Sequence, residues 1–287
     1  AMFTMMNNAR LGVAVQGLSQ CELATQKALE FAKNRNQGRN PNNPEDLSTP
    51  IINHADVRRN LLIMKSMTFI SRALCFDTAI AIDLSKIEND KYLKRKASFL
   101  TPIAKSFCTE IGSKVADLAI QIHGGMGYIE ETGISQIYRD VRVTSIYEGT
   151  NGIQAIDFVG RKLGNNGDVA YSILEEIKKN EEAISFKQPT IAKKVEIART
   201  SLMTALDWMI AQNDLNDRYS GADPFLRAFA LILGANYMVK TLLITENPEK
   251  IELAHFFINN LLPFCTIESS ISTLGTNNLY ENARSVF

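Results

Sequence analysis

The chain has 287 residues, which is more than one small domain needs and enough for two domains that each bury a core. Apolar residues make up 45% of it and charged residues 22%, a balance that excludes a disordered or fibrous chain. Its 31 lysines and arginines equal its 31 aspartates and glutamates, so no net positive field attracts nucleic acid or an anionic membrane, and small molecules and protein surfaces are the expected partners.

The N-terminal segment predicts a long amphipathic helix. Asn7 and Asn8 are good N-cap residues. Apolar residues follow them close to the helical period, at Leu11, Val15, Leu18, Ala24, Ala28, Leu29 and Ala32. The helix must end within residues 35–44, where glycine, asparagines and two prolines favour turns. Because Ala1 precedes Met2 and helical sequence follows almost at once, we expect that an upstream portion of the protein is missing.

Two further long helices are predicted next. The first begins at about Ala55 and continues into the 80s, and the second runs from near Lys91 to His123. Both repeat apolar residues at helical spacing. Gly124 and Gly125 follow directly and end the second helix in the manner of a C-cap.

A broken fourth helical element follows the glycines. Residues 135–140 read as a short helix, and Thr150 or Asn151 can cap another that carries apolar residues at helical spacing. Three long helices and a broken fourth, joined by short connections, predict an antiparallel four-helix bundle over residues 1–163.

The sequence Gly-Asn-Asn-Gly at 164–167 predicts a domain boundary. The helical pattern continues beyond it, over 169–184 and 191–211. Two more helix starts are marked by a capping residue before a proline, at Asp223-Pro224 and Asn247-Pro248. Residues 164–287 are therefore predicted to form a second helical bundle, and the whole chain is predicted to be all-α.

The cysteines predict neither disulfides nor a metal site. They lie far apart, with no CxxC pair and no histidine at ligand spacing, which favours a reducing, cytoplasmic location. The most apolar window, residues 225–244, is interrupted by Arg227, Asn236 and Lys240. These side chains are costly in hydrocarbon, so a buried helix is expected there and no membrane span.

Chemically informative residues gather in two blocks, residues 121–128 and 146–151. The glycines of the first block can simply end a helix, or they can let backbone N–H groups approach a phosphate or a flat ring closely. Gln121 adds an amide that both donates and accepts hydrogen bonds. Taken alone, each block is a weak signal.

Glu148 stands between a tyrosine and a glycine in a loop that leads into a helix. An isolated loop glutamate is most often a solvated carboxylate. The functional alternative is a general base whose pKa is raised by apolar cover. A neighbouring helix N-terminus would favour the anion instead, and the sequence leaves this contest open.

In order and separation, Gln121 to Tyr128 and Tyr147 to Gln154 are similar to the paired signatures of the acyl-CoA dehydrogenase flavoprotein family. The resemblance covers residues 1 to about 163. It implies the family's C-terminal four-helix bundle, which normally packs against an N-terminal helical domain and a middle β domain, neither of which is in this sequence. It also implies that Glu148 is the base. Residues 164–287 resemble the C-terminal extension of larger members.

The resemblance further implies an FAD cofactor bound partly across a subunit interface, and hence a homo-oligomer. The residues that it assigns to FAD are Arg35, Gln37, His54, Gln121, Gly124, Gly125, Gly149 and Thr150. Arg35 and Gln37 resemble the contacts to the flavin nucleotide of a neighbouring protomer. Arg10 and Tyr147 fall near positions that contact the acyl-CoA substrate. Gly152 departs from the family, which frequently has a polar flavin contact there.

The implied reaction is an α,β-dehydrogenation in which Glu148 removes the α-proton of the thioester and a hydride leaves for the flavin, whose electrons pass to an electron-transfer flavoprotein. An oxidase of the same fold is the near alternative. A catalytically silent helical scaffold that binds a partner is the distant one. We expect this fragment to bind FAD weakly and to be inactive by itself.

Overall fold

The computed structural model describes residues 2–43, 45–277 and 279–286, so positions 1 and 44 of the predicted terminus and turn lie outside the described residues. Within those ranges the fold is helical, without a β-strand. Two isolated β-bridges, Asn36 with Pro50 and Asn40 with Asn43, occur in the loop after the first helix. The predicted all-α class is confirmed.

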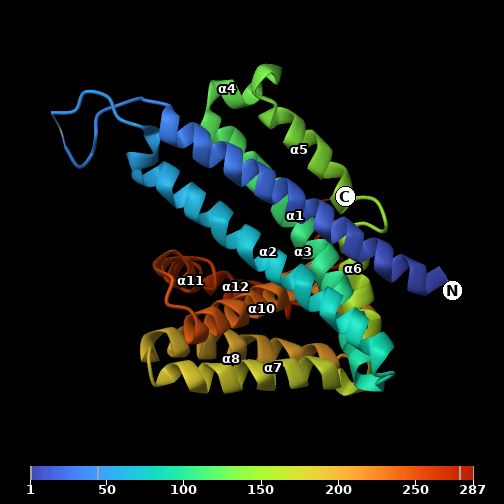
Figure 1. Cartoon of the computed structure of the whole chain (residues 1–287). Helices are drawn as coiled ribbons and strands as arrows, with labels where there is room; N and C mark the ends of the chain where they lie inside the picture. The colour runs from blue at the N-terminus through green and yellow to red at the C-terminus, as the bar shows by residue number, and fades with distance from the viewer. Residues whose placement is uncertain (1, 44, 278, 287) are drawn as a thin grey trace.

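Three long helices form the first layer: α1 (Met2–Asn34), α2 (Ala55–Ile87) and α3 (Lys91–His123). Each has 33 residues, which corresponds to about 50 Å of helix. Figure 1 shows them side by side along one diagonal. The predicted start at Asn7 or Asn8 is wrong, because the residues from Met2 onward contain no helix breaker and α1 extends through them.

The fourth element of this bundle is broken, as predicted. Its pieces are α4 (Gly125–Tyr128), α5 (Ile134–Arg142) and α6 (Asn151–Asp157). The connecting turns are η1 (Ile51–Asn53), η2 (Glu130–Thr132), η3 (Val143–Ser145) and the π-helical η4 (Phe158–Lys162). Helix α5 packs on α1 and α3, whereas α6 packs on α3. The antiparallel four-helix bundle is therefore present.

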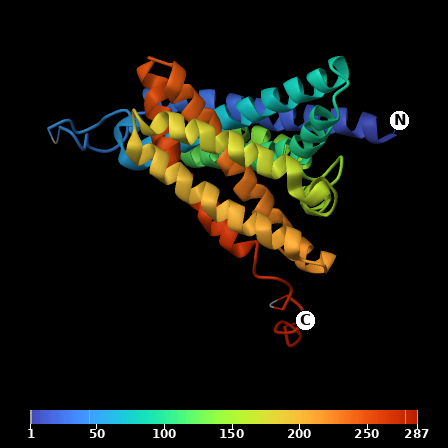
Figure 2. The ribbon, with the colours of Figure 1, turned by 90° about the horizontal axis from the view of Figure 1, so that it is seen from below.

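The second half contains α7 (Gly164–Ser185), α8 (Pro189–Ala211), α9 (Leu215–Ser220), α10 (Ala222–Ile244), α11 (Pro248–Asn260) and α12 (Pro263–Ile271). Seen from below, α7 and α8 lie in front of the first bundle (Figure 2). Asn247 caps α11 as predicted. Asp223 does not cap α10, which begins one residue earlier, because its carboxylate pairs with Arg227 instead.

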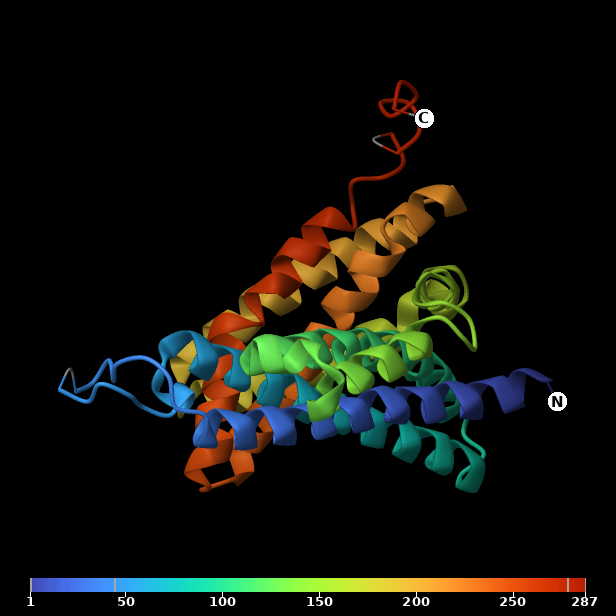
Figure 3. The ribbon, with the colours of Figure 1, turned by 90° about the horizontal axis from the view of Figure 1, so that it is seen from above.

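The two halves share one core. Phe99 and Phe158 of the first half meet Phe229 of α10 with ring centroids 5.1 and 5.8 Å apart. Asn165 and Asn166 have positive φ at the predicted boundary, so the chain bends there although the apolar core is continuous. The division into domains 1–163 and 164–287 stays a prediction. From above, the segment after α12 leaves both bundles (Figure 3).

Helix α10 is, within the described ranges, the one helix long and apolar enough by length and composition to cross a membrane. In this fold 67% of that stretch is buried against other helices. Its polar side chains also find partners, since Arg227 donates to Glu268 at 2.9 Å and Asn236 accepts from Asn180 at 2.8 Å. The apolar run therefore serves as the core of the second bundle.

Candidate active site

Five of the residues assigned to a flavin line one cavity of about 690 Å³, where α1 and α3 end and α2 begins. They are Arg35, Gln37, His54, Gly124 and Gly125. Backbone hydrogen bonds dock the turn after α1 onto the segment before α2, from Gln37 N to Thr49 O (2.9 Å) and from Ile51 N to Arg35 O (2.8 Å). Gln121 is exposed and does not line this cavity.

The cavity offers hydrogen-bond donors on one wall. The guanidinium of Arg35 is exposed and donates to Gln37 Oε1 at 3.3 Å, which leaves most of its five N–H groups facing outward. His54 Nε2 donates to Gln37 O at 2.7 Å and so holds the turn. This wall can bind an anionic or hydrogen-bond-accepting ligand.

Another part of the cavity lining is bare backbone. Gly124 ends α3 with φ 59° and ψ −140°, a conformation that glycine adopts and other residues strongly avoid. A Cβ built on Gly124 or Gly125 would meet no atom within 4 Å. Packing within the chain therefore leaves room at these two positions, and a ligand can approach their backbone closely.

His123 also lines the cavity. Its Nδ1 donates to Ala119 O at 2.7 Å, and its ring stacks on Phe31 with centroids 4.2 Å apart. Burial lowers the pKa of His123, so the ring favours its neutral form. The Nδ1 hydrogen bond therefore satisfies a carbonyl group at the end of α3.

Glu148 lies in a different place, on the loop between η3 and α6. It is exposed, with φ 56°, and Gly149 follows with φ 85°. Thr150 is the N-cap of α6, since its Oγ1 accepts from Ile153 N at 3.3 Å. The hydroxyl of Tyr147 donates to the side chain of Gln16 on α1.

A buried lysine that the sequence analysis missed lies beneath this loop. Lys105 has no exposed surface, and its Nζ donates to Gly149 O (2.8 Å) and Asn151 Oδ1 (3.1 Å). Burial and, to a smaller extent, the charge of Arg10 lower the pKa of Lys105 to about 8, although Glu148 opposes both. The sequence contained a signal for the burial of this lysine. Lys105 is the single charged residue between positions 97 and 109, in a stretch whose other residues are apolar or small on every face of the helix.

Arg10 is buried near the same loop. Its Nη1 lies 3.0 Å from Asp157 Oδ2, and the two side chains are 6% and 2% exposed. Asp157 also accepts from Arg161 Nε at 2.5 Å. The guanidinium of Arg10 is thus committed to an internal ion pair, and its contact with a substrate stays a prediction. Asp157 is a second residue that the sequence analysis missed.

The structure therefore gathers the predicted residues other than Gln121 in two groups. One surrounds the cavity at the C-terminal end of α3, and the other lies over Lys105 in the middle of that helix. The 18 residues from Lys105 to His123 correspond to about 27 Å along α3. That Arg35 and Gln37 serve the flavin of a neighbouring protomer stays a prediction.

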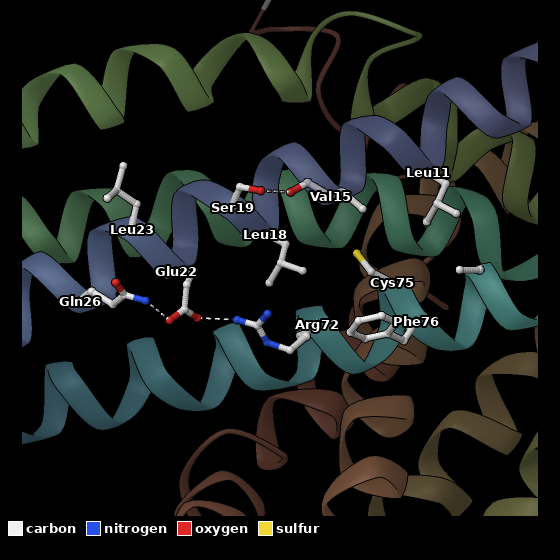
Figure 4. Close-up of a pocket in the computed structure, with 11 residues that line it drawn as sticks. Leu11, Val15, Leu18, Ser19, Glu22, Leu23, Gln26, Arg72, Cys75 and Phe76 are labelled. Atoms are coloured by element: carbon white, nitrogen blue, oxygen red, sulfur yellow. Dashed lines mark hydrogen bonds and ion pairs between the residues drawn. The ribbon is translucent and has the colours of Figure 1, made fainter.

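A second cavity, of about 520 Å³ and mostly apolar, lies between α1 and α2. Figure 4 shows that Arg72 of α2 points across it toward Glu22 of α1, with Nη2 and Oε2 2.5 Å apart. Val15 and Phe76, also in this view, are 43% and 62% exposed. Val15 belongs to the periodic apolar set predicted for α1 but faces this groove rather than the core.

The sequence is similar to those of known proteins. Residues 1–163 match the family model described as the C-terminal domain of acyl-CoA dehydrogenase. Over 234 residues the chain is 43% identical to 3-methylmercaptopropionyl-CoA dehydrogenase of Ruegeria pomeroyi, which covers 78% of this chain and 40% of that protein.

The fold is similar to that of two solved structures. One is Caenorhabditis elegans ACDH-11 in complex with C11-CoA, with a TM-score of 0.81, 20% identity, and coverage of 99% of this chain and 47% of the other. The second is an acyl-CoA dehydrogenase from Bacillus anthracis complexed with FAD, with a TM-score of 0.74, 18% identity, and coverage of 94% and 49%. The chain spans less than half the length of each of these three proteins.

Proposed function

The chain belongs to the acyl-CoA dehydrogenase family, and we propose that it carries the catalytic base, Glu148, of an FAD-dependent enzyme that dehydrogenates an acyl-CoA thioester between its α and β carbons. One observation carries this proposal. The segment Tyr147–Thr150, which lies within the matched domain, forms a turn tied to α3 from below and leaves the Glu148 carboxylate on the exposed side.

FAD is the cofactor of this family, and the cavity at the end of α3 fits part of it. The open glycine backbone at Gly124 and Gly125 admits a flat or phosphate-bearing group, and Arg35 and Gln37 supply donors in the same cavity while His54 holds their turn. We include Gln121, Gly149 and Thr150 as further contacts. When bound, FAD supplies the hydride acceptor that no protein side chain provides.

Glu148 has the task of taking the α-proton. It must lie within hydrogen-bond reach of the α-carbon and be shielded from water, so that its carboxylate is basic enough for the transfer. Its side chain is exposed among the described residues, so the bound acyl chain, the flavin or another part of the assembly must cover it. In this proposal Arg10 and Tyr147 border the substrate.

The separation of the two groups of residues supports a proposal about the assembly. We propose a homo-oligomer in which the cavity at the end of α3 serves a neighbouring protomer, and a separate electron-transfer flavoprotein as the electron acceptor. The chain alone would then bind FAD weakly and be inactive. We also propose a location in the reducing cytoplasm, from the wide spacing of the four cysteines in the sequence.

The decisive experiment measures exchange of the α-proton of an acyl-CoA in D2O, using the complete protein with FAD. Glu148→Gln should slow this exchange by roughly 10²- to 10⁴-fold, because a positioned base contributes that much, while FAD content is unchanged. Glu131→Gln, which also neutralises an exposed glutamate, is the matched control and should exchange at the wild-type rate.

Wild-type exchange in Glu148→Gln would refute the assignment of the base. Absence of exchange in the wild-type protein would favour the silent scaffold. Consumption of oxygen with substrate but without an added acceptor would identify an oxidase instead of a dehydrogenase.

A further inference from the structure

The turn that carries Glu148 has an unfavourable backbone. Glu148 and Gly149 are consecutive residues with φ 56° and 85°, in the left-handed region that side chains with a Cβ avoid. Such a conformation persists only where surrounding groups determine it. A Cβ at Gly149 would lie 2.9 Å from Gln154 Nε2, so the inner side of the turn is also in close contact with α6.

Two side chains bind the carbonyl groups of this turn from inside the protein. Gln154 Nε2 donates to Glu148 O at 3.2 Å, and Lys105 Nζ donates to Gly149 O at 2.8 Å. Lys105 comes from the middle of α3 and is fully buried. A buried ammonium is costly unless its N–H groups are hydrogen-bonded, and the bond to Gly149 O is one of the two that Lys105 donates.

The same lysine also fixes the residue after the turn. Asn151 Oδ1 accepts from Lys105 Nζ and from Thr109 Oγ1, both at 3.1 Å, while its Nδ2 donates to Ser106 O at 3.2 Å. These three α3 residues lie within about one turn of that helix. The loop is therefore anchored to a single rigid segment on both sides of Thr150.

The charges of this group favour one another. Both acceptors of Lys105 are neutral, and Glu148 is the anion whose field raises the pKa of Lys105 against the effect of burial. The carboxylate thus stabilises the ammonium that holds its own turn. Arg10, the other nearby cation, acts in the opposite sense on Lys105 and is itself paired with Asp157.

We propose that Lys105 is a positioning residue: by binding Gly149 O and Asn151 Oδ1 it holds the left-handed turn at 148–149 and thereby aims the Glu148 carboxylate. The consequence for catalysis rests on the proposed function, whereas the control of the turn does not. Lys105 does not touch substrate in this arrangement, because it lies beneath the backbone of the loop.

The turn itself is tested first, by amide hydrogen exchange of the peptide covering residues 146–154 in this chain. Lys105→Met keeps an unbranched side chain of similar length and removes the donors. We expect exchange in that peptide to rise roughly 10- to 100-fold, the range for losing hydrogen bonds from a charged donor. Lys96→Met is the control, since Lys96 is a partly buried lysine of the same helix that pairs with Glu176 away from the loop.

Catalysis is tested next, in the complete protein with FAD. Lys105→Met should lower kcat for α-proton exchange by roughly 10- to 100-fold, since a misplacement of about 1 Å costs that much, with KM and FAD content unchanged. A merely structural role would change KM and FAD content together with kcat. If Lys105→Met does not fold, Thr109→Val removes one hydrogen bond to Asn151 and should show a smaller change in the same two measurements.

The outcomes separate the two proposals. Faster loop exchange together with reduced kcat supports both. Faster loop exchange in a protein whose wild type does not exchange the α-proton supports the control of the turn and removes the proposed function. Loop exchange and kcat at wild-type values in Lys105→Met overturn the inference.

Discussion

Replacing Asp157 with asparagine removes the anion of the buried pair between α1 and α6. Arg10 Nη1 and Asp157 Oδ2 are 3.0 Å apart, and the side chains are 6% and 2% exposed. Asparagine has nearly the same shape, so the substitution leaves the packing intact. It leaves the Arg10 guanidinium charged, buried and without a counter-ion, while its Nε already lacks a partner among the described atoms.

The expected loss follows from this burial. Breaking a buried pair by removing one partner costs about 3–5 kcal/mol, because an uncompensated charge stays inside the protein. Asp157 also binds Arg161, but that arginine is 58% exposed and can be solvated by water, so its contribution is small. We therefore expect Asp157→Asn to lower the free energy of unfolding by about 3–5 kcal/mol.

Urea unfolding followed by circular dichroism and by fluorescence of Trp208 measures this loss. Asp168→Asn is the matched control, since Asp168 pairs with Arg95 at 2.7 Å with side chains 35% and 42% exposed, and exposed pairs contribute about 0–1 kcal/mol. Similar small losses in both variants would refute the reasoning, because burial would then not determine the cost. A double variant, Arg10→Met with Asp157→Leu, should recover much of the loss by removing both charges.

Two further predictions concern the Glu148 loop. Gly149→Ala places a Cβ on a residue with φ 85°, at 2.9 Å from Gln154 Nε2. We therefore expect the free energy of unfolding to fall by about 1–2 kcal/mol and, in the complete protein, α-proton exchange to become slower. Wild-type values of both quantities would contradict this prediction. Lys105 has a pKa of about 8 in the fold and about 10.4 when unfolded, so between these pH values the folded state binds fewer protons. Its contribution to unfolding free energy should therefore rise with pH from about 8 to 10.4, a slope that unfolding curves of Lys105→Met should lack.

The fold was largely predictable where local chemistry marks the ends of helices. Both ends of α3, at Asp90 and Gly124, and the Asn247 cap of α11 follow from capping residues, prolines and glycines that act on their neighbours in sequence. The same reasoning failed at Asp223, because an ion pair with Arg227 competes for its carboxylate. From the sequence alone, an aspartate that caps a helix cannot be told from one that pairs with a residue one helical turn further on.

The candidate site also has residues that could be predicted from the sequence and residues that could not. The residues around the cavity were found because short motifs carry them, and the structure brings Arg35, His54 and Gly124 together. Lys105 and Asp157 were missed because their partners are 44 and 147 residues away in the chain. Their importance comes from burial, which a sequence pattern indicates only where a charged residue interrupts a stretch that is apolar all round.

Helix α3 connects the two parts of the proposed active site. Its middle turn binds the loop of Glu148 through Lys105, and its C-terminal end at Gly124 forms one wall of the cavity. If that cavity serves the flavin of a neighbouring protomer, the same rigid helix fixes a base for one flavin and a binding surface for another. Under this proposal FAD binding and orientation of the base both depend on α3, and we expect a monomeric form to lose FAD and activity together.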